Sequence, residues 1–308
     1  MNQDQKLRMM KGIMHENQVV RYRNTHPVLD QNGSSYLVSI GDDVILLDHG
    51  PGAHHRLLQA GVSATQVTHI AFSHLHYDHC IDYVRLVLTR WDDGAGRFPE
   101  LKVFGPAPIA DMTEKLFGRD GAFATDINAR VNNPSSIYIF EQRGGTPPRR
   151  WPAPEVTEMS SGTVIDNGAW QLQSIGVPHM QPQLNSLGLR IDSDEGSVVY
   201  SGDCGPSDAL VRLGKNCDVM IHMCNNLSGS ITLKAHNTFA CGHLDVANIA
   251  SKARAKTLVL THMYQQIDVP GIRERIVKEI SEIYDGVVVL GEDLMDIPIA
   301  PPLLAKFQ

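Results

Sequence analysis

Cysteine is scarce in this sequence, and that excludes a disulfide scaffold. Five cysteines occur among 308 residues, an odd number, and no two of them form a C-x-x-C pair. A chain of this length buries enough core to fold without such cross-links. We therefore expect reduced thiols, as in a cytoplasmic protein, at Cys80, Cys204, Cys217, Cys224 and Cys241.

Long apolar runs are also missing. No stretch approaches the roughly 18 consecutive apolar residues that a membrane-spanning helix needs. The opening residues, MNQDQKLRMMKGIMHENQ, contain no apolar run of signal-peptide length. Hydrophobic residues make up 42% of the chain and charged residues 20%, which is typical of a globular protein. We expect a soluble, cytoplasmic chain that has no membrane partner.

An excess of basic residues is the third feature that the chain lacks. It has 27 Lys and Arg against 34 Asp and Glu, which gives a formal net charge of −7. Proteins that bind a phosphate backbone are more often basic. The balance argues mildly against nucleic acid as the main partner, although local basic patches remain compatible with it.

What the chain does contain is a dense group of metal-binding side chains. The stretch FSHLHYDHCIDY (72–83) holds four of them within six positions: His74, His76, Asp78 and His79. It ends an apolar run, VTHIAFSH, that predicts a buried strand, and it precedes a segment with helical spacing of apolar residues. Loops of this kind are where α/β proteins usually build their sites. Imidazole and carboxylate ligands suit zinc or a similar divalent ion.

Three more candidate ligands end later apolar runs: His179 in SIGVPHM, Asp203 in VVYSGDC and His262 in LVLTHMY. Each one alone is more simply interpreted as a polar residue in a turn or a local hydrogen bond. Together with the first group they make seven ligands, which is too many for one tetrahedral zinc. The set fits two ions that share a carboxylate, and water between two cations ionises near neutral pH.

In this order along the chain, HLHYDH, VPH, SGD and LTH resemble the metallo-β-lactamase superfamily. The resemblance implies an α/β fold, the αβ/βα four-layer sandwich of two mixed sheets with helices outside. It also implies two zinc ions per chain, with manganese or iron as alternatives. LLDHGPG resembles the family's aspartate loop and places Asp48 behind the ligands. The implied ligands are His74, His76 and His179 for one metal, Asp78, His79 and His262 for the other, and Asp203 as the bridge.

A later block narrows the resemblance. NTFACGHLDVANIASKARAKTLVLTHMY (237–264) is similar to the ribonuclease Z-like branch, in which a Gly-His pair precedes a helix and the last ligand. This implies that His243, with Asp78, handles protons in catalysis; a helix-start histidine with a local hydrogen bond is the plainer alternative. The segment between His179 and Asp203 is too short for the tRNA-binding arm that ribonuclease Z carries there.

The long segment of this chain instead lies at 91–160, between His79 and His179. It is rich in glycine, proline and asparagine, and we expect it to form a cap inserted in a single domain that spans 1–308. This arrangement resembles the arylsulfatase-like hydrolases of the branch. We therefore expect a small-molecule substrate: an ester, a sulfate ester, a lactone, an amide or an activated aryl halide.

Several alternatives stay open. A nuclease or phosphodiesterase of the ribonuclease Z type is one, and an iron-dependent redox enzyme of the same fold is another. His79 favours hydrolysis, because the iron-dependent members depart from this ligand pattern. Exposed insertions often form subunit contacts, so a homodimer is also open. Candidate pocket residues, for which ordinary packing is an equal alternative, are Trp91, Arg130, Phe140 and Arg143.

Overall fold

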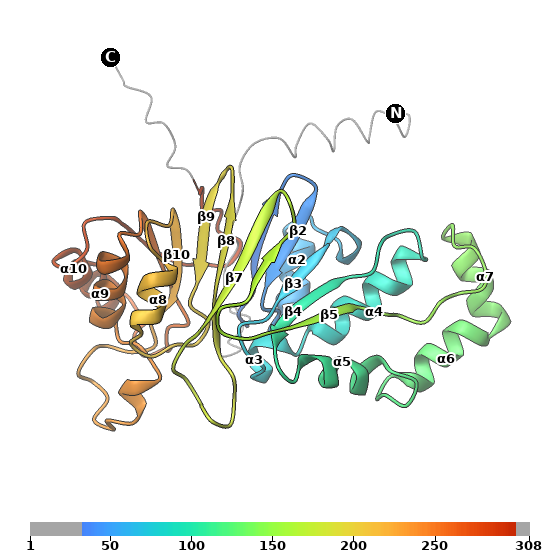
Figure 1. Cartoon of the computed structure of the whole chain (residues 1–308), viewed down its shortest axis with the longest axis horizontal. Helices are drawn as coiled ribbons and strands as arrows, with labels where there is room; N and C mark the ends of the chain where they lie inside the picture. The colour runs from blue at the N-terminus through green and yellow to red at the C-terminus, as the bar shows by residue number, and fades with distance from the viewer. Residues whose placement is uncertain (1–32, 300–308) are drawn as a thin grey trace, which may run out of the picture.

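The computed structural model describes residues 33–299, so the N-terminal stretch that lacks a signal-like run lies outside the described residues. The chain builds two β-sheets with helices on their outer faces (Figure 1). The first sheet has the order β1 (Tyr36–Ile40), β2 (Asp43–Leu47), β3 (His69–Ala71), β4 (Lys102–Pro106), β5 (Glu155–Met159). The second sheet has the order β12 (Val287–Leu290), β11 (Thr257–Thr261), β10 (Val219–Met223), β9 (Gly196–Tyr200), β8 (Leu187–Ser193), β7 (Trp170–Gly176), β6 (Val164–Asp166).

Both sheets are mixed. In the first, β1 and β2 form an antiparallel hairpin, and Gly41 takes a φ of 56° in its turn, a conformation that favours glycine. Strands β2 to β5 are parallel. In the second sheet, β6 to β9 are antiparallel and β9 to β12 are parallel. The predicted α/β fold, a sandwich of two mixed sheets, is confirmed.

The helices cover the two outer faces, while an apolar layer fills the space between the sheets. That inner layer joins residues of both sheets, such as Tyr36 and Leu47 to Leu189 and Val259. The helices beside the first sheet are α2 (Ala53–Gln59), α3 (Tyr77–Cys80), α4 (Tyr83–Gly94), α5 (Ile109–Phe117), α6 (Ala124–Asn132) and α7 (Pro134–Gln142). Those beside the second are α8 (Asp208–Leu213), α9 (His243–Ala253) and α10 (Ile272–Ser281). Among residues 33–299, no helix is long and apolar enough to cross a membrane.

The carboxyl ends of several strands meet at one edge of the sandwich. Strand β3 leads into His74, β9 into Asp203 and β11 into His262. Strand β7 runs toward His179, and β2 leads directly into Asp48. Because the parallel strands of each sheet end on the same side, polar residues far apart in the sequence converge there.

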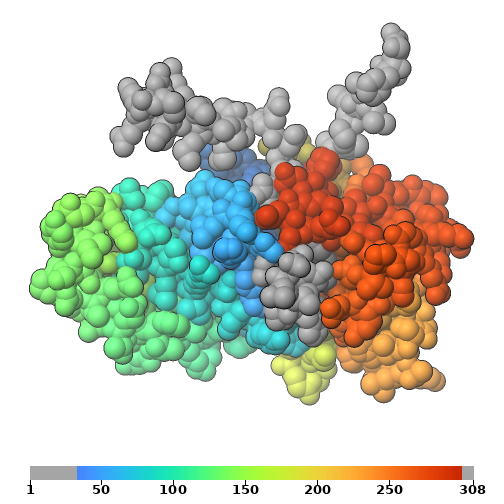
Figure 2. Space-filling model, turned by 180° about the vertical axis from the view of Figure 1, so that it is seen from behind, coloured from blue at the N-terminus to red at the C-terminus, as the bar shows by residue number. Residues whose placement is uncertain are grey.

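The segment 91–160 takes a larger part in the fold than a cap would. It supplies β4 and β5, and α5 packs on both of these strands. Helices α6 and α7 lie at the end of the molecule opposite α9 and α10 in Figures 1 and 2, and well away from α3 in Figure 1. The two ends of the segment therefore belong to the sheet, and the role of 91–160 as a cap over the site stays a prediction.

The proposed pocket residues of this segment make packing contacts within it. The guanidinium groups of Arg130 and Arg143 each pair with the carboxylate of Asp92, at 3.1 Å and 2.6 Å. The Trp91 indole donates to a backbone carbonyl, and Phe140 is buried. These contacts hold α4, α6 and α7 together, which favours the packing alternative for all four residues.

Candidate metal centre

The loop after β3 and the short helix α3 that follows it supply four of the candidate ligands. His74 follows the strand directly, and His76 is the residue that precedes α3, with extended backbone angles. Asp78 and His79 lie in the single turn of α3. A Cβ at Gly50 would collide with the carbonyl oxygen of Asp78, so glycine there lets the aspartate loop support this turn from behind.

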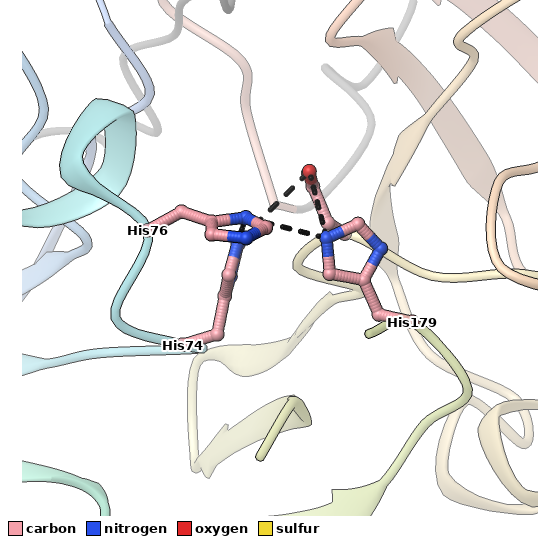
Figure 3. Close-up of side chains that lie close together, drawn as sticks. His74, His76 and His179 are labelled. Atoms are coloured by element: carbon pink, nitrogen blue, oxygen red, sulfur yellow. Dashed lines mark hydrogen bonds and ion pairs between the residues drawn. The ribbon is translucent and has the colours of Figure 1, made fainter. Parts of the chain in front are cut away.

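The first donor group consists of three histidines whose rings point toward one another (Figure 3). His74 Nε2 lies 3.0 Å from His76 Nδ1, which lies 3.4 Å from His179 Nε2. Oδ2 of Asp203 lies 3.9 Å from His74 Nε2 and 3.6 Å from His179 Nε2. Ligand atoms bound about 2.0–2.1 Å from a tetrahedral zinc stand about 3.3 Å from each other, so these spacings suit such an ion.

The second donor group lies on the other side of Asp203. Its members are Asp78, His79 and His262. Oδ1 of Asp203 is 3.0 Å from His262 Nε2 and 3.4 Å from His79 Nε2. Oδ2 of Asp78 is 3.7 Å from the same nitrogen of His79 and 3.9 Å from that of His262. Asp203 thus turns one carboxylate oxygen toward each donor group.

Hydrogen bonds behind the rings indicate which nitrogen each histidine offers. His179 Nδ1 donates to the backbone carbonyl of Phe239 at 3.0 Å, and His79 Nδ1 donates to Asp48 Oδ2 at 2.8 Å. Ser73 Oγ donates to Asp48, and it therefore accepts from His74 Nδ1 at 2.9 Å. In all three histidines the proton sits on Nδ1, so each Nε2 presents a lone pair to the centre. Nitrogen lone pairs that converge at these distances suit a cation between them, so the donor set fits a metal ion.

The electrostatics of the two groups agree with this assignment. Burial lowers the pKa of His74 well below its usual range, and burial and His179 lower that of His76. Neutral imidazole is the form that binds a metal. Although burial raises the pKa of Asp203, His262 and His79 outweigh it and hold that pKa well below its usual range. The bridging carboxylate therefore stays ionised.

His79 differs from the other rings. Burial alone would lower its pKa, but Asp203 and then Asp48 raise it well above the usual range. Two carboxylates on either side of one buried ring attract positive charge. A proton satisfies that demand on the ring itself, and a divalent ion at Nε2 satisfies it equally well.

His243 belongs to neither donor group. It begins α9, and its Nδ1 accepts from the backbone N–H of Ser228 at 3.0 Å. Its Nε2 lies 2.6 Å from Oε2 of Glu279 on α10. The ring thus contacts the loop before α9 through one nitrogen and α10 through the other. The role in proton transfer stays a prediction, and these contacts suit the plainer alternative of a helix-start histidine.

Two residues that support the site were not singled out from the sequence. Tyr200 donates from its hydroxyl to Asp48 Oδ2 at 2.7 Å, and Ser73 gives the same carboxylate both its backbone N–H and its hydroxyl. Asp48 itself is fully buried and lies where the resemblance placed it, behind His79. Ser73 and Tyr200 lie directly before His74 and near Asp203, a proximity that was the available signal.

Two buried donor groups joined by one carboxylate, at the strand ends of an αβ/βα sandwich, define a metal-dependent hydrolase. The chain belongs to the metallo-β-lactamase superfamily, whose family model matches residues 29–262. The His and Asp clusters are able to bind metal, as the sequence predicted.

Curated relatives indicate which branch of the superfamily the chain resembles. A protein of Mycolicibacterium gilvum named Ribonuclease Z is 27% identical over 280 residues, which cover 89% of this chain and 92% of that protein. A Ribonuclease Z of Mycobacterium bovis strain BCG is 28% identical over 284 residues, covering 89% and 95%. The resemblance to the ribonuclease Z-like branch is confirmed, whereas the arylsulfatase-like affinity finds no support.

Solved structures share the fold. YhfI of Bacillus subtilis, a metallo-β-lactamase fold protein, superposes with a TM-score of 0.69 at 19% identity and covers 91% of this chain and 97% of its own. The short form of human tRNase Z gives a TM-score of 0.64 at 19% identity, covering 93% and 100%. These likenesses concern the fold alone.

The relatives' names correct the expectation about partners. Proteins that match nearly their whole length to this chain are named after cleavage of RNA. The expected small-molecule substrate, and the argument against nucleic acid, are therefore wrong. Net charge is a weak guide to this partner, because phosphate recognition depends on local groups, and a centre able to hold cations can attract phosphate whatever the total charge is.

Proposed function

We propose that this protein is a metal-dependent phosphodiesterase that cleaves RNA, an enzyme of the ribonuclease Z type. The observation that carries the proposal is the orientation of Asp203, which directs one oxygen to each of two donor groups. Two adjacent cations suit in-line cleavage of a phosphodiester, because each can stabilise one of the two oxygens that exchange at phosphorus. The names of the curated relatives point to the same substrate.

The residues of the chain have distinct parts in this proposal. His74, His76 and His179 would hold one ion and Asp78, His79 and His262 the other, with Asp203 between them. Zinc suits these ligands, and it would supply an ionised water and neutralise the charge of the phosphoryl oxygens.

Two carboxylates of the chain have further roles: one orients a ligand, and the other can exchange a proton with the substrate. Asp48 accepts a hydrogen bond from Nδ1 of His79, so the His79 ring cannot turn away from the centre. Asp78 is partly exposed beside the centre, with a side-chain exposure of 16%, and it is the carboxylate best placed to exchange a proton with the substrate.

The test uses zinc-loaded protein and RNA. We expect endonucleolytic cleavage of a structured RNA with a 3′ extension, and hydrolysis of bis-p-nitrophenyl phosphate. His76→Ala should lower both rates by at least about 100-fold, as expected when an ion that stabilises the transition state is lost. The matched control is His55→Ala, which removes an exposed histidine from α2 and should leave both rates within about twofold.

Two results would overturn the proposal. One is protein that carries its full metal complement but leaves every RNA intact. The other is a single iron per chain with redox activity, which would support the iron-dependent alternative. Metal content by plasma emission spectrometry distinguishes these cases, and we expect about two zinc ions per chain.

A further inference from the structure

One aromatic side chain of the metal-binding loop faces solvent. Tyr77 is 64% exposed, although it lies between His76 and Asp78 and close to the fully buried His74. Ile81, one turn further on, is 50% exposed. Residues four apart share a face of a helix, so α3 presents a small apolar surface to water beside the centre.

Packing does not account for this ring. Within residues 33–299, Tyr77 belongs to none of the three apolar clusters that form the core layers. Full burial of such a side chain would contribute roughly 1.5–3 kcal/mol, a gain that is forgone here. A single exposed aromatic residue is ordinary on a protein surface, so the significance of Tyr77 rests on its place between residues of the two donor groups.

The position of the ring relative to the two donor groups is specific. His76 belongs to the first group and Asp78 to the second, so Tyr77 stands at their junction. His76 and Asp78 are also partly exposed, whereas His74 and His79 are buried. The centre therefore meets solvent along residues 76–78, the side on which Tyr77 stands.

The backbone that carries Tyr77 is held firmly. Its carbonyl accepts from the N–H of Ile81 at 3.0 Å, and the carbonyl of His79 accepts from the N–H of His49 at 2.7 Å. The N–H of Asp82 in turn donates to the carbonyl of His49 at 3.1 Å. A ring on a fixed backbone loses little conformational entropy when a ligand covers it, which favours stacking.

The charge of the chain makes stacking valuable for the proposed substrate. With a net charge of −7, the protein gains less from general attraction to phosphates than a basic protein does. Unpaired bases of RNA stack on exposed aromatic rings, and each such contact contributes about 1–3 kcal/mol without dependence on net charge.

We propose that Tyr77 is a stacking platform for the nucleobase next to the phosphate that is cleaved. The inference rests on the proposed function and deepens it: the enzyme requires an unpaired base at that position of the RNA. Tyr77 binds and positions the substrate, and it takes no part in bond breaking.

The test compares Tyr77→Ala with Tyr138→Ala on RNA. Tyr138 is a matched control, because it is 62% exposed but lies on α7 at the far end of the molecule. We expect Tyr77→Ala to lower kcat/KM for RNA between about 5-fold and 150-fold, the loss of one stacked base. Tyr77→Trp should restore the rate, and Tyr138→Ala should match the wild type.

A second substrate separates stacking from damage to the metal loop. Once the cleavage site is mapped, RNA that lacks the base beside that phosphate should be a poor substrate for the wild type. Tyr77→Ala should cause no further loss on this abasic RNA. Binding of intact RNA to metal-free protein, followed by fluorescence anisotropy, should weaken by a similar factor in Tyr77→Ala.

The outcomes are distinguishable. If the wild type cleaves RNA and Tyr77→Ala cleaves it equally fast, the stacking inference is wrong and the proposed function stands. The inference is also wrong if the variant loses the same factor on abasic RNA, or if it loses bound zinc. If the metal-loaded wild type cleaves no RNA, the proposed function fails and this inference fails with it.

Discussion

Asp48 shows how much a single buried carboxylate can organise. It accepts from Ser73 N–H, Ser73 Oγ, Tyr200 Oη and His79 Nδ1, at 2.7, 2.7, 2.7 and 2.8 Å. A buried carboxylate is tolerated only when such donors replace water. Its backbone φ of 58° lies in the left-handed region, where aspartate is one of the few non-glycine residues found. The carboxylate thereby holds two ligand histidines, one directly and one through Ser73.

Removing one of the groups that donate a hydrogen bond to Asp48 tests how much it supports the metal site. We expect Tyr200→Phe to weaken binding of the metal beside His79 by about 10-fold, because partners behind metal ligands typically contribute 10–100-fold in affinity. The measurement is a competition titration with a chelator of known affinity. Tyr83→Phe is the control: its buried hydroxyl contacts Thr113 instead, so its metal affinity should equal that of the wild type.

At this scale the sequence was informative about the ligands and less so about their support. All seven predicted ligands and Asp48 converge, because each ends an apolar run and the runs are strands with neighbouring ends. Nearness to Asp203 was the only sequence signal for Tyr200, and it is weak because a tyrosine at the end of a buried strand is an ordinary core residue. For His243 the proton-transfer role stays a prediction, because a Gly-His pair also suits a helix that begins there.

Helices α4, α6 and α7 are joined by one acidic residue. Asp92 on α4 pairs with Arg130, Arg143 and Arg149, and Arg149 also stacks over the Trp91 ring at 3.9 Å. Burial raises the pKa of Asp92, but Arg149 and Arg143 outweigh it and leave the pKa below its usual range. The ionised carboxylate therefore stabilises the fold.

We expect Asp92→Asn to lower the free energy of unfolding by about 1–3 kcal/mol at neutral pH, because Arg149 is buried and would lose its charged partner. A carboxyl whose pKa is depressed by folding contributes above its unfolded pKa and loses that contribution as pH falls through the folded value. The difference from the wild type in urea denaturation should therefore shrink below about pH 4. Asp126→Asn, which removes an exposed partner of Arg130, should change stability by less than about 0.5 kcal/mol.

The segment around these helices was the hardest to interpret from sequence. Strand β5, EVTEM, is an edge strand whose first four residues are exposed or only partly buried, so it carries no apolar run. Strand β4, KVFGP, is short and ends in Gly-Pro, which suggests a turn. Their pairing joins residues about 53 positions apart, for example Lys102 with Glu155, and no local pattern reveals such a contact.

For the whole molecule, metal binding should be linked to stability. An ion that binds only the folded chain stabilises it by about 4 kcal/mol when its free concentration is 1,000 times its Kd. We expect the Tm of zinc-loaded protein to fall by several degrees after chelation, measured by scanning calorimetry. The Asp203→Asn variant should show little of this change, and an equal response in that variant would contradict the assigned bridge.

The two sheets divide the centre between them. The ligands ahead of residue 80 belong to the first sheet's half of the chain, and His179, Asp203 and His262 belong to the second. Neither half supplies all the members of either donor group, because each of the two groups draws on both halves. Tight metal uptake can therefore follow only the docking of the two halves. Metal ions bound at the centre would therefore stabilise the docked halves late in folding. A chain whose halves are misaligned would bind no metal and would lack activity.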